Sequence, residues 1–429
     1  MKKWLTALTL IPILLLQACH NESTMNIPEI NSDSVGKNVT PDESAKEVDS
    51  EPELTEISIQ FAGDIFIHQG PMDVAQTGEN TFDFKPFFKE IAPFINGDLA
   101  IANMEVPVDA REGNQDVAGF PLFNTPFEIL DAVQYAGFNH MVTANNHAFD
   151  FGWDGLLNTV NSFERAGLTH TGMNVDWEDF NTPTILDIKG IQVGMIAYTE
   201  SVNGLEHLVP ESSRAYAVRR FQSHTLEDIP QMTQDITDLR AAGAELVIVA
   251  LHWGIEYADS PTQMQRLIAA ELSEAGADVI MGKHSHTVQP IEWHYRADGS
   301  RSLIMYSLGN FLADQTRLTE PSIQSQINDP WEHHPFIGRT QFGMLVSLQV
   351  TRTLDGEIGL ETAYVLPTLC MRDFTGNTLG TVDGVRVMPV MNGELPEFVT
   401  EPDVRAWGRR AYEHVVDIVG EAFIASSVE

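Results

Sequence analysis

Four stretches of the chain share one local pattern, in which an amphipathic helical segment ends at Ala-Gly and is followed by a short apolar run. They read FEILDAVQYAGFNHMVTANNH, LLNTVNSFERAGLTHTGMN, MTQDITDLRAAGAELVIVALHW and MQRLIAAELSEAGADVIMGKHSH. Glycine ends a helix because it adopts the left-handed conformation, and an apolar, β-branched run after it is typical of a buried parallel strand. The pattern predicts helix–strand units joined by right-handed crossovers, which define the α/β class. Their irregular spacing argues against a solenoid of sequence repeats.

Polar side chains follow the predicted strands at the points where the strands end. Ligands of open α/β sheets bind beyond these carboxyl ends. Five strand ends supply the polar groups: Asp64 and His68; Asn103 and Glu105; Asn145, Asn146, His147 and Asp150; His252; and His284 and His286. Imidazole together with oxygen suits divalent Mn, Fe or Zn, and no Cys lies in these stretches. We therefore predict a metal site at the edge of one sheet.

The segment 340–367 alternates well enough to form two strands around the turn at Asp355-Gly356. We expect these strands to form a second sheet that packs on the first, with helices outside the two sheets. The C-terminal segment 401–429 has the spacing of an amphipathic helix packed on the domain, over about 402–425, with Trp407, Tyr412 and Val415 or Val416 as its buried stripe.

The N-terminus, MKKWLTALTLIPILLLQAC, has two lysines and an apolar run that is short for a membrane span. It resembles a bacterial lipoprotein signal over residues 1–18, and this resemblance implies that Cys19 is lipidated. A plain secretory signal or an uncleaved anchor is the alternative. We expect an exported protein, anchored in the membrane by lipid at the bacterial cell envelope, with its folded domain extracytoplasmic.

The segment 19–56 is rich in Glu, Asp, Ser, Asn and Pro, which predicts a disordered acidic tether. If Cys19 carries lipid, only Cys370 remains, so no intramolecular disulfide can form. Stability must then come from the core or from bound metal.

The 61 acidic and 25 basic residues leave a formal net charge of −36. Such a surface repels polyanions, so nucleic acid is not an expected partner. The charge itself is explained by solubility or salt adaptation, or alternatively by a functional acidic face. The sequence has no Walker-type glycine loop, so we do not expect ATP-driven polymerisation by this chain alone.

Six motifs in order carry a family resemblance: GDIF, NMEVP, ANNHAFDFG, LHWGIEY, GKHSHTVQPIE and YSLGNFLAD. Together they resemble the CapA-type capsule or poly-γ-glutamate synthesis family, which is similar to calcineurin-like metallophosphoesterases. The resemblance covers about 57–314 and implies one domain over 57–400. The implied fold is a metallophosphoesterase-like four-layer α/β/β/α sandwich.

The resemblance also implies roles for individual residues. It implies two divalent ions, held by Asp64, Glu105, Asn146, His252, His284 and His286. His147 would be the catalytic proton donor or a charge stabiliser. The Asp-x-His start of the phosphoesterases is missing, because Phe66 stands at the position of that His. His68 either substitutes for it or only packs.

A second group of residues is predicted to line the pocket or to support the ligands: His68, Asn103, Asn145, Asp150, Trp253, Glu256 and Asn310. Asp150 would orient a neighbouring His. For Trp253 a packing role is the alternative, and for Asn310 a role in a glycine turn. The pair His333 and His334 lies in a polar, Pro-containing stretch that is typical of a surface loop.

Three functions are possible on these grounds and are kept as hypotheses. The first is a surface-anchored capsule-biosynthesis protein with a dinuclear metal site, which meets an anionic capsule polymer and other capsule-synthesis subunits. The second is a metal-dependent phosphoesterase acting on a phosphoester substrate. The third is a non-enzymatic assembly subunit that binds polymer, since fold alone does not fix function.

Overall fold

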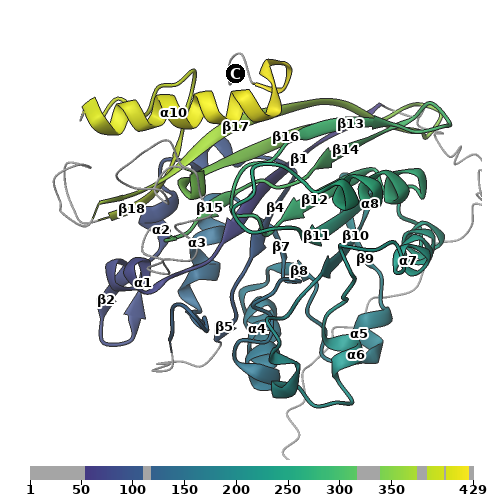
Figure 1. Cartoon of the computed structure of the whole chain (residues 1–429), viewed down its shortest axis with the longest axis horizontal. Helices are drawn as coiled ribbons and strands as arrows, with labels where there is room; N and C mark the ends of the chain where they lie inside the picture. Colours follow the sequence, from purple (N-terminus) through teal and green to yellow (C-terminus); the bar gives the residue numbers. More distant parts are fainter. Residues whose placement is uncertain (1–53, 110–116, 316–338, 374–383, 401, 425–429) are drawn as a thin grey trace, which may run out of the picture. The chain divides into compact units, whose positions relative to one another are not determined.

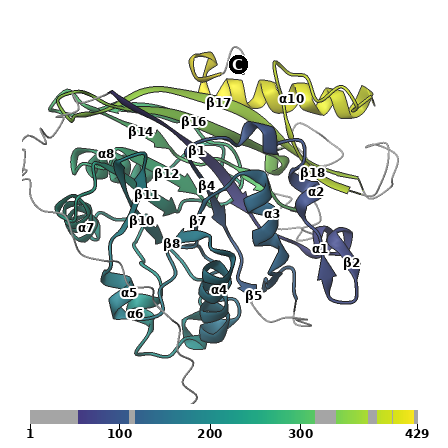
Figure 2. The same cartoon turned by 180° about the vertical axis from the view of Figure 1, so that it is seen from behind.

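The computed structural model describes residues 54–109, 117–315, 339–373, 384–400 and 402–424. The strands of these residues form two large sheets, and the helices lie on the outside of the sheets (Figure 1; Figure 2). Cys19, His333 and His334 lie outside the described residues, as does the predicted tether up to residue 53. Within the described part of the chain, no helix combines the length and apolar character needed to span a membrane.

The first sheet has eight strands, in the order β18-β17-β16-β1-β4-β7-β8, with β15 also paired to β1. Its strands are β1 (Thr55–Ile65), β4 (Leu99–Met104), β7 (His140–Val142), β8 (Thr169–Thr171), β15 (Asn310–Leu312), β16 (Phe342–Arg352), β17 (Ile358–Asp373) and β18 (Gly384–Pro389). The strands β1, β4, β7 and β8 run parallel, whereas β16, β17 and β18 pair antiparallel. The first strand begins at Thr55, two residues before the predicted start of the domain.

The second sheet has six strands, in the order β13-β14-β12-β11-β10-β9. Its strands are β9 (Thr184–Ile188), β10 (Ile191–Thr199), β11 (Leu246–His252), β12 (Val279–Lys283), β13 (Ile291–Tyr295) and β14 (Arg301–Met305). The central four strands are parallel, and β9 and β13 are antiparallel edges. Two small pairs complete the strands: β2 (Gln76–Gly78) with β3 (Thr81–Phe82), and β5 (Val108–Asp109) with β6 (Thr125–Pro126).

The two strands predicted over 340–367 exist, but their assignment to a second sheet was wrong. Strand β16 pairs antiparallel with β1 over eight residue pairs, from Thr55 with Arg352 to Ala62 with Leu345. These strands therefore widen the first sheet, and the second sheet is built from β9 to β14. The alternation of a strand reports which of its faces is buried, but it does not report which neighbour the strand pairs with.

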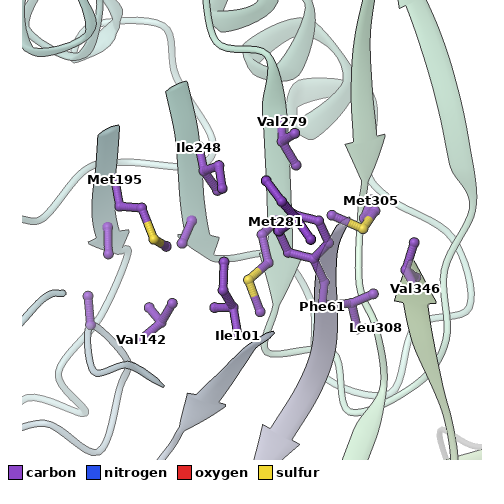
Figure 3. Close-up of a cluster of buried hydrophobic side chains, with 14 of the residues drawn as sticks. Phe61, Ile101, Val142, Met195, Ile248, Val279, Met281, Met305, Leu308 and Val346 are labelled. Atoms are coloured by element: carbon purple, nitrogen blue, oxygen red, sulfur yellow. The ribbon is translucent and has the colours of Figure 1, made fainter. Parts of the chain in front are cut away.

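The main core lies between the two sheets. Figure 3 shows Phe61 and Ile101 of the first sheet pointing toward Ile248 and Met281 of the second, and all four are fully buried. Along β1, Ile57, Ile59 and Phe61 face this core, as expected for side chains that alternate along a strand. Burying each such side chain stabilises the fold by roughly 1.5–3 kcal/mol.

Helices cover the outer face of each sheet. The first is covered by α1 (Gln69–Ala75), α2 (Lys85–Phe88), α3 (Glu128–Ala136) and α4 (Gly152–Ala166), and the second by α7 (Ile229–Ala241) and α8 (Gln263–Glu274). The shorter helices are α5 (Trp177–Asn181), α6 (Arg214–Ala217), η1 (Ala92–Phe94), η2 (Leu205–Leu208), η3 (Arg339–Gln341) and η4 (Glu421–Phe423). The predicted four-layer α/β/β/α arrangement is confirmed.

The C-terminal helix α10 (Pro402–Val419) packs along β16 and β17 (Figure 1). Its buried face includes Val404, Ala411, Val415 and Val419. Trp407 and Tyr412 of the predicted stripe are half-buried and pack against the hydrophobic cluster that contains Val404 and Ala411.

Candidate metal centre

Side chains from both sheets converge at one end of the parallel strands. The first sheet contributes Asp64 and Asn103 from β1 and β4, and Glu105, Asn146 and His147 from the loops that follow β4 and β7. The second sheet contributes His252 at the end of β11 and, after β12, His284 and His286. The site thus forms where two stacked sheets end, and the prediction that it belongs to one sheet was wrong. The reason is that β11 pairs with β10 and β12, and that β12 pairs with β11 and β14, so neither strand pairs with β7.

Glu105 lies at the middle of the atoms that could bind an ion. Its Oε1 lies 3.4 Å from His252 Nε2 and 3.8 Å from His286 Nε2. Asn146 Oδ1 lies 3.0 Å from His252 Nε2. Among the described residues, two buried groups have ligand atoms within 4.8 Å of one another, namely Glu105 with His284 and His286, and Asp64 with Glu105 and His252.

Within the part of the chain that the structure describes, three buried atoms in this cluster have no hydrogen-bond partner: Glu105 Oε1, His252 Nδ1 and His284 Nδ1. Leaving a buried polar atom without a partner costs about 1–3 kcal/mol. A divalent cation would compensate this cost at the carboxylate and at imidazole nitrogens, which suit Mn, Fe or Zn. The donor set therefore fits a divalent metal.

The backbone at the two closing histidines is in the left-handed region, with φ of 95° at His284 and 57° at His286. Such residues cost on the order of 1–3 kcal/mol and persist where their surroundings enforce them. Here the Tyr257 amide donates to the Ser285 carbonyl at 2.7 Å, and the His284 amide lies 3.4 Å from Asp64 Oδ2. This turn brings both imidazoles to the same centre.

Asp64 is held by its neighbours. Asn103 Nδ2 donates to Asp64 Oδ1 at 2.8 Å and to Glu105 Oε2 at 3.2 Å, and His286 Nδ1 lies 3.4 Å from Asp64 Oδ2. Burial acts to raise the pKa of Asp64, but the hydrogen bonds of His286 and Asn103 and the charges of His286 and Lys283 together outweigh it, and the pKa is lowered. The pKa of Glu105 is raised well above its usual range by burial and by the charge of Asp64, against the opposing charge of Lys283.

Lys283 is a buried cation whose role the sequence motifs did not reveal. Its Nζ donates to Asn103 Oδ1 at 3.0 Å and to the Ala144 carbonyl at 3.1 Å, and the residue is 1% exposed. Burial lowers the pKa of Lys283 to about 7, although Asp64 and Glu105 act to raise it. The signal available in the sequence was a charged residue within an apolar strand, since buried lysines almost always have partners.

His147 lies beside this cluster and is fixed at one ring nitrogen. Its Nδ1 is 2.8 Å from Asp150 Oδ2, which also accepts from the Phe123 amide at 2.8 Å. The His147 amide donates to Asn145 Oδ1, and Asn145 Nδ2 donates to the Met104 carbonyl. Because Nδ1 is hydrogen-bonded to Asp150, any proton exchange between His147 and a ligand would use Nε2.

His68 is placed in an aromatic wall, apart from the candidate ligand groups. Its Nδ1 accepts from the Asp314 amide at 3.2 Å, and its ring centroid lies 4.7 Å from that of Phe66 and 5.0 Å from that of Phe123. Phe66 stacks on His286 at 5.0 Å. Phe66 and His68 thus occupy the side of the centre next to His286 without supplying a ligand atom to either candidate group.

The other predicted pocket residues have different positions. Asn310, the first residue of β15, has Oδ1 3.0 Å from His286 Nδ1 and donates from Nδ2 to the Thr340 carbonyl and to Gln315 Oε1. Trp253 is fully buried among the helices behind the second sheet, where its Nε1 donates to the Tyr306 carbonyl. It faces away from the site because neighbouring residues of a strand point to opposite faces. Glu256 is exposed, and its charge acts on Glu105, His284 and His286.

Comparison with known proteins agrees with the motifs. The chain is 26% identical to the capsule biosynthesis protein CapA of Bacillus anthracis over 61% of each chain. It is 27% identical to the PGA biosynthesis protein CapA of Bacillus subtilis over 60% of this chain and 64% of that one. The chain thus matches less than two thirds of the length of these relatives.

A solved structure, the NAD nucleotidase NadN of Haemophilus influenzae, matches with a TM-score of 0.40 and 12% identity, over 87% of this chain and 65% of that one. This TM-score is too low to establish a shared fold. The family model described as bacterial capsule synthesis protein PGA_cap matches residues 58–315, which is more than half of the chain. The chain therefore belongs to the PGA_cap family of bacterial capsule synthesis proteins.

Proposed function

We propose that this protein acts in the synthesis of a capsule polymer of the poly-γ-glutamate type, as a metal-dependent hydrolase of phosphoesters. Membership of the PGA_cap family supports the capsule role. The observation that carries the chemistry is the cluster of buried, unpartnered atoms of Glu105, His252 and His284, next to the fixed pair of His147 and Asp150.

The residues that would hold the metal are Glu105, Asn146, His252, His284 and His286, together with Asp64. The family resemblance implies two ions. A bound divalent ion would polarise a phosphoryl oxygen and lower the pKa of water. His147 would donate a proton from Nε2 to the leaving group, while Asp150 keeps its Nδ1 protonated and its ring oriented. Phe66, Phe123 and His68 would exclude water from one side.

The test is hydrolysis of a generic phosphodiester and a phosphomonoester by the full-length protein with Mn²⁺, in wild type and His147→Ala. Loss of the proton donor is expected to lower kcat by about 10²–10⁴-fold. Metal content should stay at the wild-type level, because His147 is not among the candidate ligands.

A wild-type protein that binds metal but hydrolyses neither ester would contradict the enzymatic part of the proposal. It would favour a polymer-binding assembly subunit, in which His147→Ala leaves capsule formation intact.

We also propose that the protein is exported and held at the cell envelope by lipid on Cys19. A Cys19→Ser variant is expected to move from the membrane fraction to the soluble fraction while keeping its metal content. A Cys370→Ser variant is the control and should stay with the membrane. Equal membrane association of Cys19→Ser and wild type would contradict the lipid anchor.

A further inference from the structure

A cavity of about 500 Å³ lies outside the candidate metal centre. It is lined by β8 and the residues that follow it, by the end of α5, by β10 and by α7. Among the described residues that line it, none belongs to either candidate ligand group. Figure 1 shows α5 and α6 below β9 in this part of the molecule. The volume lies within the range of about 300–1,000 Å³ that is typical of small-molecule sites.

One wall of the cavity carries a network of polar groups. The Tyr198 hydroxyl donates to Asp235 Oδ2 at 2.5 Å, and Gln231 Nε2 donates to Asp235 Oδ1 at 2.9 Å. The Arg219 guanidinium lies 3.8 Å from the centroid of the Phe180 ring and donates to the Phe180 carbonyl. It also lies 3.8 Å from Asp235 Oδ2. Asp235 and Arg219 therefore already have partners of opposite charge within the protein.

The charges of the lining favour a neutral ligand. The acidic and basic residues that line the cavity are Asp179, Asp235, Asp238, Arg219 and Arg220. The carboxylates outnumber the guanidinium groups, and Arg220 is paired with Glu206 at 2.6 Å, so an anionic polymer would be repelled. Burial lowers the pKa of His170 to about 4, so this ring adds no positive charge at pH 7. A cation is not favoured either, because Arg219 already occupies the Phe180 ring face.

Exposed aromatic surface adjoins the cavity at α5. Trp177 is 52% exposed, and its ring centroid lies 5.4 Å from that of Phe180, which lines the cavity, and 5.3 Å from that of Tyr216. The helix is capped by Asp176, whose side chain accepts from the Asp179 amide at 2.8 Å. The Trp177 ring is thus supported by two other rings and still presents a large apolar surface to solvent.

This combination of groups suits a sugar ring. A hydroxyl group both donates and accepts, so the hydroxyls of one sugar can bond to carboxylates and to guanidinium groups of the same site. The C–H groups on the face of a sugar can pack on the electron-rich face of an exposed indole ring. A neutral sugar also needs no opposite charge from a lining in which Arg219 and Arg220 are already paired.

We propose that this cavity and the adjoining Trp177 ring bind a neutral saccharide. The carboxylates of α7 accept hydrogen bonds from its hydroxyl groups, and the indole ring is its stacking surface. This binding site goes beyond the proposed hydrolase activity, and it does not depend on a bound metal.

The test is saturation-transfer difference NMR and calorimetric titration of the full-length protein with the neutral sugars maltotetraose, cellotetraose and chitotetraose. At least one of them is expected to bind, with an affinity that chelator does not change, because the cavity lies outside the candidate ligand groups. Trp177→Ala should weaken this binding about tenfold or more, since the stacking surface is lost. Asp238→Asn removes a charged acceptor and should weaken it severalfold.

The matched control is Tyr295→Ala. Tyr295 is an aromatic residue that is 68% exposed on β13, at the edge of the second sheet opposite β9. This variant should bind the saccharide as wild type does. Thermal melting of each variant shows whether it is folded, and the metal content of Trp177→Ala should equal that of wild type.

Binding of none of these saccharides would overturn the proposal, as would a folded Trp177→Ala with the affinity of wild type. Binding that chelator abolishes would place the sugar at the metal centre and also overturn it. The ligand class would be wrong if an oligomer of poly-γ-glutamate bound in its place and Trp177→Ala weakened that binding. A protein that binds saccharide but hydrolyses no phosphoester would contradict the proposed hydrolase activity and leave this site standing.

Discussion

At the scale of single residues, the orientation of His147 depends on one carboxylate. Asp150 Oδ2 accepts hydrogen bonds from His147 Nδ1 and from the Phe123 amide. The Phe123 ring packs edge-on against the His147 ring, with 4.8 Å between the ring centroids. Asp150 therefore fixes the ring, its tautomer and one wall of the site together.

Asp150→Asn is expected to lower kcat for phosphoester hydrolysis by about 10–100-fold, because an amide no longer stabilises a protonated imidazole. KM and metal content should change little, and both are measured beside kcat. Asp154→Asn, on the exposed face of α4, is the matched control. Loss of metal in Asp150→Asn would show that Asp150 supports the ligands and not the proton donor.

A second residue-scale prediction concerns His140, which is fully buried on β7. Its Nδ1 and Nε2 lie 2.8 and 3.0 Å from the hydroxyls of Thr169 and Thr171. Burial lowers the pKa of His140 to about 3, and the charge of His170 adds to the effect. In the unfolded chain a histidine takes up its proton near pH ~6.5.

Between these two pKa values the unfolded chain binds the extra proton, so the free energy of unfolding falls as the pH falls. The contribution of His140 is up to ~1.4 kcal/mol per pH unit. The His140→Gln variant lacks this contribution. Its free energy of unfolding, measured with urea, should therefore fall less steeply than that of wild type between about pH 6.5 and about pH 4.5. Exposed His207→Gln is the control. Parallel curves for His140→Gln and wild type would contradict the prediction.

At the scale of elements, the sequence predicted the strands and the polar residues at their ends, because both signals are local. The apolar runs ending at His252 and before His284 are strands, and their polar ends do meet. The partner of each strand was not predicted, since β16 joins β1 through contacts almost 300 residues apart in sequence. The role of Lys283 and the left-handed turn at His284 and His286 also depend on residues distant in the chain.

One close approach between elements can be tested directly. A Cβ at Gly63 of β1 would lie 1.8 Å from the Gly309 carbonyl oxygen, just before β15. Gly63→Ala must therefore push these segments apart and move the adjacent Asp64. We expect a loss of at least ~1–3 kcal/mol in the free energy of unfolding, measured with urea, and weaker metal binding.

The control for this substitution is Gly359→Ala in β17, where the atom nearest to the added Cβ is the flexible end of Glu361, at 2.9 Å, and the Thr351 carbonyl oxygen is at an ordinary contact distance of 3.8 Å. It should change stability by less than about 1 kcal/mol. Equal stability of Gly63→Ala and Gly359→Ala would show that β1 and β15 can separate without cost.

At the scale of the whole molecule, the formal charge of −36 acts on every charged ligand. A negative field raises the local concentration of divalent cations and lowers that of anions. Metal binding is thus favoured and the approach of an anionic phosphoester or polymer is opposed. Added salt screens both effects, because the Debye length falls to about 8 Å at physiological ionic strength.

The two ligands should therefore respond to salt in opposite directions. Raising NaCl from about 20 to about 200 mM is expected to weaken Mn²⁺ binding severalfold, measured by titration, and to raise kcat/KM for an anionic phosphoester at saturating Mn²⁺. The gain should be larger for a dianionic monoester than for a monoanionic diester, which makes the pair of substrates an internal control. A fall in kcat/KM for the monoester would mean that Lys283 and the bound metal dominate the field at the site over the acidic surface.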